Sequence, residues 1–230
     1  MKYVKRIVVF ASLALIATAF VAIALPLAAL YLFGLRRFAS NVLYALARWW
    51  ANRIIQMSGS VVHRAGTEHI PQSGPVCFVS NHSGIFDIVL CLSAIGRPFG
   101  FIAKKELALI PFLNLWILLL GGLFIERNNP RKALKTISDA AGHVKKGGAM
   151  IIFPEGTRSK GRGLLPFKPG AMKLAVESGA PIVPVAISGS YDVFERTGFI
   201  EKVNVSISFG QAIDQSTLPH EHKRQALSDA

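Results

Sequence analysis

The spacing of hydrophobic and polar positions changes near Met57. Beyond that residue, short apolar runs rich in β-branched residues alternate with segments in which apolar residues recur every three or four positions. The short runs predict strands over 60–63, 75–80, 99–103, 122–126, 149–153, 182–188 and 203–209, and the other segments predict helices over 84–95, 111–119, 130–146 and 169–178. This alternation is typical of an α/β domain with a largely parallel or mixed sheet flanked by helices.

The first part of the chain has a different pattern. No charged residue occurs from Ile7 to Leu35, a run of 29 positions, and residues 38–57 continue as a helix. As one helix the run would be about 43 Å long, whereas the hydrocarbon core of a bilayer is about 30 Å thick. Because Pro26 and Gly34 allow a kink or a break, a tilted spanning helix and a bent helix that enters one leaflet both remain open. Either one is a membrane-associated N-terminal segment.

Two adjacent tryptophans occur in the second helical part of this segment. Trp49 and Trp50 lie between Arg48 and Arg53, and paired tryptophans beside arginines suit a membrane interface. Ordinary packing of the two rings against the domain explains the pattern equally well.

These patterns divide the 230-residue chain into membrane-anchoring helices over 1–57, the α/β domain over 58–210 and a polar tail over 211–230. The chain is 51% hydrophobic and 17% charged, and its formal net charge is +13. Such a basic, apolar chain, without interleaved aromatic and basic residues, suits an anionic membrane surface and not nucleic acid. An acidic carrier protein is a second candidate partner. The two cysteines stand in apolar segments and predict buried thiols without a disulfide.

Residues 112–120 are apolar on all sides of the helix they predict. A helix of this kind is buried or lies in lipid. It is therefore either part of the core, which we favour, or the lining of a channel for an acyl chain.

A histidine and an aspartate five positions apart follow the apolar run 76–80. On an ideal helix such positions diverge by about 140°, so His82 and Asp87 would not meet. They can meet if His82 lies in the turn after the strand and Asp87 on the first turn of the next helix, and Gly84 makes such a turn sterically easy. An imidazole held by a carboxylate is a positioned general base. The alternative is that His82 caps the helix and Asp87 is only solvated.

Three further blocks follow this pair. The run 121–125 ends in the charged pair Glu126 and Arg127, the run 149–152 is followed by the sequence FPEGTRS at 153–159, and 180–187 has a proline inside a strand-like run. An acid and a guanidinium together in one turn are unusual in a purely structural loop. Because segments just after parallel strands gather at one edge of an α/β sheet, these blocks are expected to lie together.

In this order and spacing, the four blocks resemble those of the PlsC-type 1-acyl-sn-glycerol-3-phosphate acyltransferases, the lysophosphatidic acid acyltransferases, over about residues 59–210. H-x4-D alone is a weak signal, whereas H-x4-D followed by FPEGTRS is a strong one. The resemblance implies an α/β fold, acyl-CoA or acyl carrier protein as thioester co-substrate, and no metal or organic cofactor. It also implies that Glu155 is a binding or catalytic residue and that Gly156 and Thr157 belong to the substrate-binding turn.

The residues themselves favour direct acyl transfer. No G-x-S-x-G motif occurs, and nothing orients Ser83 as a nucleophile. His82 is therefore predicted to take the proton of an acceptor hydroxyl while Asp87 fixes the tautomer of the ring, which is worth about 10²–10⁴ in rate.

An acceptor that carries a phosphate needs cations nearby. The candidates follow three separate strands and are Lys104, Lys105, Arg127 and Arg158. Any one of them alone fits a solvated surface charge equally well. Glu155 is predicted to orient Arg158 or to accept a glycerol hydroxyl, and the alternative is a carboxylate at a helix terminus.

The expected function is a membrane-bound O-acyltransferase that acylates 1-acylglycerol-3-phosphate (lysophosphatidate) to phosphatidic acid. In a bacterium we expect it at the inner membrane, with its catalytic domain on the cytoplasmic side. The alternatives are another lysolipid or glycerol-3-phosphate as acceptor, a lipid hydrolase that uses the same His-Asp pair, and a non-catalytic membrane protein. The presence of the four residues His82, Asp87, Glu155 and Arg158 disfavours the last.

Overall fold

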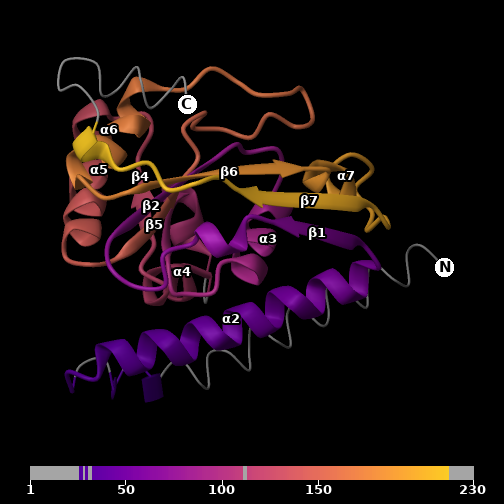
Figure 1. Ribbon diagram of the computed structural model, residues 1–230. Coiled ribbons are helices and arrows are strands. Elements are labelled where there is room, and N and C mark those ends of the chain that lie inside the picture. Colours follow the sequence, from indigo (N-terminus) through magenta and orange to yellow (C-terminus); the bar gives the residue numbers. More distant parts are fainter. Residues whose placement is uncertain (1–25, 28, 31–32, 111–112, 218–230) are drawn as a thin grey trace.

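A seven-stranded mixed sheet forms the centre of the protein (Figure 1). The computed structural model describes residues 26–27, 29–30, 33–110 and 113–217. In these residues the strands follow the order β1-β7-β6-β2-β5-β3-β4 across the sheet. Their bounds are β1 Val61–Ala65, β2 Val76–Ser80, β3 Gly100–Lys104, β4 Leu123–Ile125, β5 Ala149–Ile152, β6 Ile182–Ser188 and β7 Asn204–Phe209. Each strand overlaps a run that the sequence predicts.

The five strands from β6 to β4 are parallel, and β1 is parallel to β7. The β6–β7 pairing is antiparallel, so the sheet is mixed. The central strands β2 and β5 are short and almost wholly buried, as expected for parallel strands covered on both faces. All five parallel strands therefore end at the same edge of the sheet.

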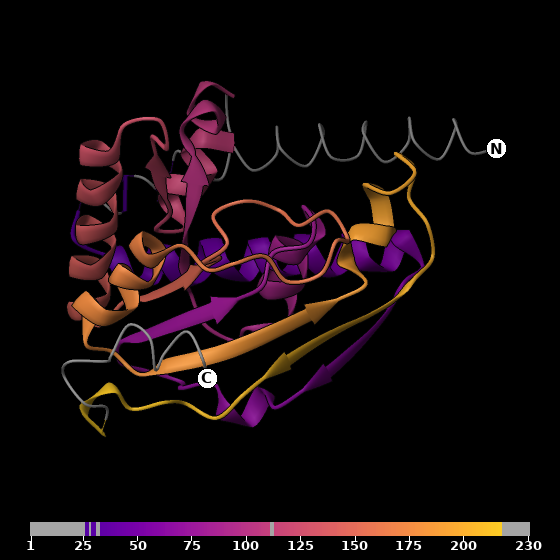
Figure 2. The same cartoon turned by 90° about the horizontal axis from the view of Figure 1, so that it is seen from above.

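Helices cover both faces of this sheet. The long helices are α2 Arg36–Ser58, α3 Phe86–Ala94, α5 Pro130–Lys145 and α6 Pro169–Ser178, and the short ones are α4 Leu113–Leu119, α7 Ser190–Phe194 and the 3₁₀ helices η1 Thr67–His69, η2 Lys105–Leu109 and η3 Gln215–Thr217. Buried residues of α5 and α6 pack together with Cys77, Met150 and Ile152 on one side. Buried residues of α2 and α3 pack with Phe78 and Ile151 on the other. Seen from above, α2 passes behind the strands (Figure 2).

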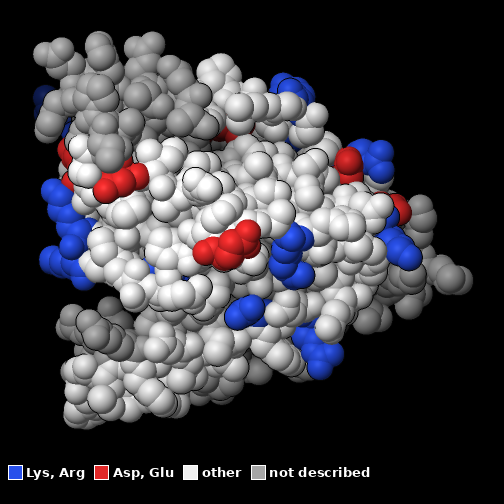
Figure 3. All heavy atoms as spheres, in the orientation of Figure 1, with Lys and Arg blue, Asp and Glu red and all other residues white. Residues whose placement is uncertain are grey.

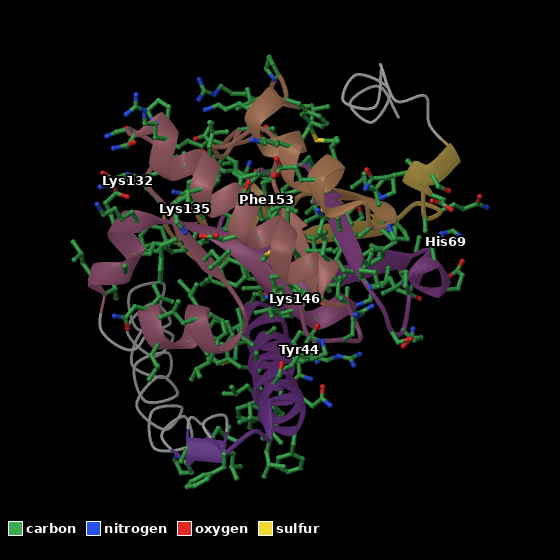
Figure 4. All side chains as sticks on the ribbon, turned by 90° about the vertical axis from the view of Figure 1, so that its left-hand side faces the viewer. Tyr44, His69, Lys132, Lys135, Lys146 and Phe153 are labelled. Carbon is green, nitrogen blue, oxygen red and sulfur yellow. The ribbon has the colours of Figure 1, made fainter. Side chains whose placement is uncertain are left out.

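Helix α2 joins the domain through a stripe of small residues. Ala39, Leu43, Ala47 and Ala51 recur every four positions and are buried. The hydroxyl of Tyr44 points into the domain and donates to the carbonyl oxygen of Ile95 (Figure 4), and burial raises the pKa of this tyrosine. The helix is thereby fixed to the end of α3.

The two tryptophans of α2 have different surroundings. Trp50 packs edge-on against Trp116 of α4, with ring centroids 5.3 Å apart. Trp49 is 51% exposed, and the guanidinium of Arg53 lies over its ring. Packing against the domain therefore accounts for Trp50 but not for Trp49.

Of the predicted membrane-anchoring segment 1–57, residues 1–25, 28 and 31–32 lie outside the described residues, and the part from 36 onward is α2. Within the described part of the chain, no helix has both the length and the apolar character that crossing a membrane requires.

Two other segments differ from expectation. Helix α4 was favoured as core, and it is core on one side only: Ile117 is buried and Leu113, Trp116 and Leu119 pack against the core, whereas Leu118 is 52% exposed. The polar tail expected from 211 begins in contact with the domain. Ile213 pairs with Ile182, and the buried Gln215 side chain donates to the carbonyl oxygen of Ala175.

Candidate active site

The carboxyl-terminal edge of the parallel strands carries the predicted motifs. His82 comes two residues after β2, and Glu155 and Arg158 follow the neighbouring strand β5. Lys104 ends β3, and Arg127 comes two residues after β4. In open α/β sheets this edge is where ligands bind.

The histidine and the aspartate of the H-x4-D motif meet as predicted. Asp87 lies in the first turn of α3, and its Oδ2 is 2.6 Å from Nδ1 of His82. The same oxygen accepts hydrogen bonds from the backbone N–H groups of Ser83 at 2.7 Å and Gly84 at 3.0 Å. Asp87 is fully buried and so cannot be the solvated carboxylate of the alternative interpretation. A carboxylate at Nδ1 places the proton there and leaves the lone pair on Nε2.

One face of the His82 ring is fixed by packing. The ring stacks on Phe153, with centroids 4.1 Å apart and planes 22° apart. Phe153, which is labelled in Figure 4, comes directly after β5. The His82 side chain is 17% exposed, and among the described residues Nε2 has no hydrogen-bond partner. This nitrogen is therefore the atom that can take a proton from a substrate.

Gly84 is needed for a different reason from the one expected. Its backbone does not have a positive φ, so the turn does not require the conformational freedom of glycine. A Cβ at this position would lie 2.5 Å from Oε2 of Glu195 and 3.1 Å from Cα of Tyr191. The missing side chain allows α7 to approach the histidine turn.

Glu155 supports the histidine turn from inside the protein. It is only 2% exposed, and its Oε1 accepts a hydrogen bond from the backbone N–H of His82 at 2.7 Å. Its Oε2 accepts one from the backbone N–H of Leu165 at 3.0 Å. The predicted contact between Glu155 and Arg158 is absent, because both carboxylate oxygens face backbone donors. The residue also lies in a turn and not at the end of a helix.

The loop that contains Glu155 is joined to the histidine turn at two further points. The backbone N–H of Ser159 donates to the carbonyl oxygen of His82 at 2.7 Å, and that of Lys160 donates to the carbonyl oxygen of Ser83 at 3.1 Å. Gly156 has φ +66°, a left-handed conformation that favours glycine. The adjacent Thr157 is exposed. The two motif loops thus form one hydrogen-bonded unit.

The two arginines lie within electrostatic reach of each other. Arg158 forms an ion pair with Glu195, with Nη1 2.6 Å from Oε1. Burial lowers the pKa of Arg127, the charge of Glu106 raises it and the charge of Arg158 lowers it again. Arg127 forms no ion pair with any other described residue. An exposed guanidinium without such a partner is suited to bind an anion.

The two lysines occupy the outer part of the same edge. Lys104 pairs with Glu106 at 3.0 Å and Lys105 pairs with Glu126 at 2.9 Å, and both lysine side chains are more than half exposed. Glu126 also pairs with Lys132 on α5. The structure therefore places Lys104 and Lys105 in surface ion pairs and not beside His82.

A protein-family model matches the part of the chain that contains this site. Residues 61–188 match the model of the family described as Acyltransferase, and this segment contains both motif loops. The chain belongs to the Acyltransferase family. The resemblance inferred from the four sequence blocks is thereby confirmed.

Individual relatives of the chain carry a more specific description. The chain is 44% identical over 116 residues to the 1-acyl-sn-glycerol-3-phosphate acyltransferase of Escherichia coli (strain K12). This match covers 50% of the chain and 47% of the relative. The chain is 30% identical over 173 residues to the enzyme of that name from Borreliella burgdorferi, covering 75% and 69%. The chain thus spans about half the length of several curated relatives that it matches.

A solved structure supports the fold along most of the chain. The 1-acyl-sn-glycerophosphate (LPA) acyltransferase PlsC from Thermotoga maritima aligns with a TM-score of 0.71 at 26% identity, and the alignment covers 94% of this chain and 92% of that one. The α/β fold with a mixed sheet flanked by helices is therefore confirmed.

Neither cysteine of the chain is an activated thiol. Burial raises the pKa of Cys77 to about 12, and burial together with the charge of Asp87 raises that of Cys91 well above its usual value. Neither is a thiolate near neutral pH, so neither is a nucleophile. In the described ranges, no group of three or more His, Cys, Asp or Glu side chains is arranged to hold a metal ion.

Sequence reasoning missed one charged residue of the acyltransferase site. Glu195 pairs with Arg158 and also accepts a hydrogen bond from the backbone N–H of Ile85. It follows α7, outside the matched residues 61–188, and α7 has only five residues. No local pattern of that length could have indicated it.

Proposed function

We propose that the chain transfers a fatty acyl group from an acyl thioester to the free hydroxyl of 1-acylglycerol-3-phosphate, giving phosphatidic acid. The observation that carries the proposal is the His82–Asp87 pair, which leaves Nε2 of His82 open at the ligand-binding edge of the sheet. The names of the relatives, 1-acyl-sn-glycerol-3-phosphate acyltransferases, support this acceptor.

The first step forms the new ester bond. Nε2 of His82 removes the proton of the acceptor hydroxyl as its oxygen attacks the thioester carbonyl carbon. The imidazole becomes an imidazolium, which the buried carboxylate of Asp87 stabilises through Nδ1. The carbonyl π electrons move to oxygen and give a tetrahedral oxyanion.

The second step breaks the thioester. The oxyanion re-forms the carbonyl and expels the thiolate of the carrier. The imidazolium of His82 returns its proton to this thiolate, so that free thiol and ester leave and the enzyme is unchanged. No covalent acyl-enzyme is formed, which agrees with the protonated state of both buried cysteines.

The phosphate of the acceptor is assigned to the arginines. Arg127 offers an exposed guanidinium without an ion-pair partner among the described residues, and Arg158 uses one nitrogen for Glu195 and has further N–H donors. Lys104 and Lys105 add positive charge at the outer part of the edge. In this proposal the acceptor is therefore held between the arginines and His82.

The co-substrate and the surroundings are part of the same proposal. An acyl thioester, as acyl-CoA or on an acidic acyl carrier protein, is the only co-substrate, and no metal or organic cofactor takes part.

Residues 1–57 hold the protein on an anionic membrane, in a bacterium the cytoplasmic side of the inner membrane, and nucleic acid is not a partner. The exposed Trp49 supports membrane contact, as do exposed basic residues such as Lys132 and Lys135 along α5 (Figures 3 and 4).

One assay tests the reaction. Purified protein is incubated with lysophosphatidate and either acyl-CoA or acyl carrier protein thioester, and phosphatidic acid and free fatty acid are both measured. The proposal expects phosphatidic acid from the wild type and from His63→Ala, a control histidine exposed on the edge strand β1, but not from His82→Ala. Free fatty acid without phosphatidic acid would support a lipid hydrolase. Product from glycerol-3-phosphate or another lysolipid alone would support a different acceptor.

A deletion tests the membrane assignment. Removal of residues 1–35 leaves α2 intact. The proposal expects loss of vesicle binding and a larger loss of activity on bilayer-embedded lysophosphatidate than on a short-chain, water-soluble acceptor. Equal losses on the two acceptors would contradict it.

A further inference from the structure

Glu195 joins the two motif loops from outside both of them. Its Oε1 lies 2.6 Å from Nη1 of Arg158 in the EGTR turn, and its Oε2 accepts a hydrogen bond from the backbone N–H of Ile85 at 2.5 Å. Ile85 lies between His82 and Asp87 in the sequence and precedes α3. A single carboxylate thus fixes a guanidinium relative to the turn that carries the base.

The backbone around Glu195 is itself well fixed. Val193 and Ser190 of α7 are buried, and the N–H of Glu195 donates to the carbonyl oxygen of Tyr191 at 3.1 Å. Gly189, before the helix, has φ +79°, and a Cβ there would lie 2.6 Å from the carbonyl oxygen of Asn204. The side chain of Glu195 is only 16% exposed. Its carboxylate is therefore held at a defined position.

The ion pair between Arg158 and Glu195 adds little to the stability of the fold. Arg158 is 40% exposed, and an ion pair of this exposure contributes about 0–1 kcal/mol to folding. The carboxylate of Glu195 can reach the histidine turn because Gly84 has no side chain: a Cβ there would lie 2.5 Å from Oε2 of Glu195. The contact between α7 and the histidine turn therefore depends on both residues.

The carboxylate of Glu195 also counters the repulsion between two arginines. The positive charge of Arg158 acts on Arg127, so two like charges share the edge of the sheet. In the absence of an anionic ligand, a flexible arginine side chain would turn away from such a neighbour. A carboxylate on one side of Arg158 keeps its guanidinium in place, while the N–H donors on the other side remain free for an anion.

We propose that Glu195 is a positioning residue for acyl transfer, which holds the guanidinium of Arg158 beside the histidine turn, where the phosphate of the acceptor binds. This inference rests on the proposed function. Glu195 does not touch the reacting atoms and acts through Arg158. Its loss should therefore change the binding of the acceptor more than the chemical step.

The test compares Glu195→Gln with Asp192→Asn. Asp192 lies on α7 and pairs with Arg196 four residues later, so its substitution removes one acidic charge from the same helix without involving Arg158. We expect Glu195→Gln to raise KM for lysophosphatidate about tenfold and to change kcat much less. KM for the thioester should not change. Asp192→Asn should leave all three values at those of the wild type.

A double-mutant cycle separates positioning from a general effect on the fold. In an Arg158→Ala background, Glu195→Gln should change KM less than about twofold, because its target is already gone. Glu195→Asp, which keeps the charge, should recover part of the affinity. Full additivity of Glu195→Gln and Arg158→Ala would overturn the proposal, as would a fall in kcat alone.

A chemical measurement makes the result independent of activity. Phenylglyoxal labelling of Arg158, followed by peptide mass spectrometry, should be faster in Glu195→Gln than in the wild type and unchanged in Asp192→Asn. If the wild type does not acylate lysophosphatidate, the proposed function fails, and the labelling rate alone decides the position of Arg158. Unchanged labelling in Glu195→Gln would overturn the positioning role even if acylation is observed.

Discussion

The two ends of the catalytic edge are built differently. Around β2 and β5, buried carboxylates and backbone hydrogen bonds tie His82, Asp87 and Glu155 into one rigid unit. Around β3 and β4, Lys104 and Lys105 form exposed ion pairs with neighbouring acids. The difference matches two tasks. A general base needs a fixed position relative to the reacting hydroxyl, whereas exposed lysines that attract an anion without binding it directly act over longer distances and tolerate movement.

The largest effect should come from the rigid end. His82→Ala removes the proton acceptor, and we expect kcat to fall by about 10²–10⁴. The fold should stay intact, because the buried carboxylate of Asp87 keeps its hydrogen bonds from the backbone N–H groups of Ser83 and Gly84. Activity within tenfold of the wild type would falsify the mechanism. The exposed His63, changed to Ala, is the control.

Glu155 should affect stability and activity together. Glu155→Gln keeps the length of the side chain but turns one acceptor oxygen into an amide donor, which faces the backbone N–H of His82 or of Leu165. A buried backbone donor without a partner costs about 1–3 kcal/mol, and we expect the free energy of unfolding to fall by that amount. Activity should fall as well, because the N–H of His82 sets the position of the histidine turn.

The control for Glu155 is Glu177→Gln. Glu177 is a carboxylate on α6 that contacts Ser138 and Lys173 near the surface, so its substitution should change stability little. Denaturant unfolding and steady-state kinetics on both variants make the comparison. If Glu155→Gln keeps the stability of the wild type and only raises KM, the carboxylate binds substrate and the supporting role is wrong.

Arg127 is exposed, like the two lysines of the outer part of the edge, but it has no ion-pair partner among the residues described. Arg127→Lys keeps the charge and loses the planar fork that binds phosphate through two hydrogen bonds. We expect KM for lysophosphatidate to rise about tenfold, with a smaller change in kcat. Arg131→Lys, at an exposed position of α5, should change neither. A fall in kcat at constant KM would exclude Arg127 as a phosphate ligand.

Local patterns predicted most of the fold. The bounds of α6 and β6 agree with the predicted ranges, and every strand was located, because apolar runs and helical spacing are visible within ten or fifteen residues. Helix α7 was missed because its five residues are too few to show a helical period. The direction of β7 relative to β6 could not be read from the alternation alone, which is why a parallel and a mixed sheet both remained open.

The site was predicted less completely, because its contacts join distant parts of the chain. His82 and Asp87 are close in sequence, so their spacing was enough to predict their contact. The hydrogen bond from His82 to Glu155 spans 73 positions and uses a backbone donor, which leaves no trace in the pattern of side chains. The ion pair of Arg158 with Glu195 likewise involves a residue outside every motif.

The smallest effect should come from the exposed end. Lys105→Ala breaks an ion pair with Glu126, but Lys132 also pairs with that carboxylate and remains. Stability should therefore change by less than about 1 kcal/mol. KM for lysophosphatidate should rise less than about threefold, and the rise should vanish at high salt because exposed charges are screened over about 10 Å at 0.1 M ionic strength. Kinetics at low and high salt, with Lys146→Ala at the opposite end of α5 as control, check this. A tenfold rise in KM that persists at high salt would instead place Lys105 in direct contact with the phosphate, and the contrast between a rigid and a tolerant end of the edge would be lost.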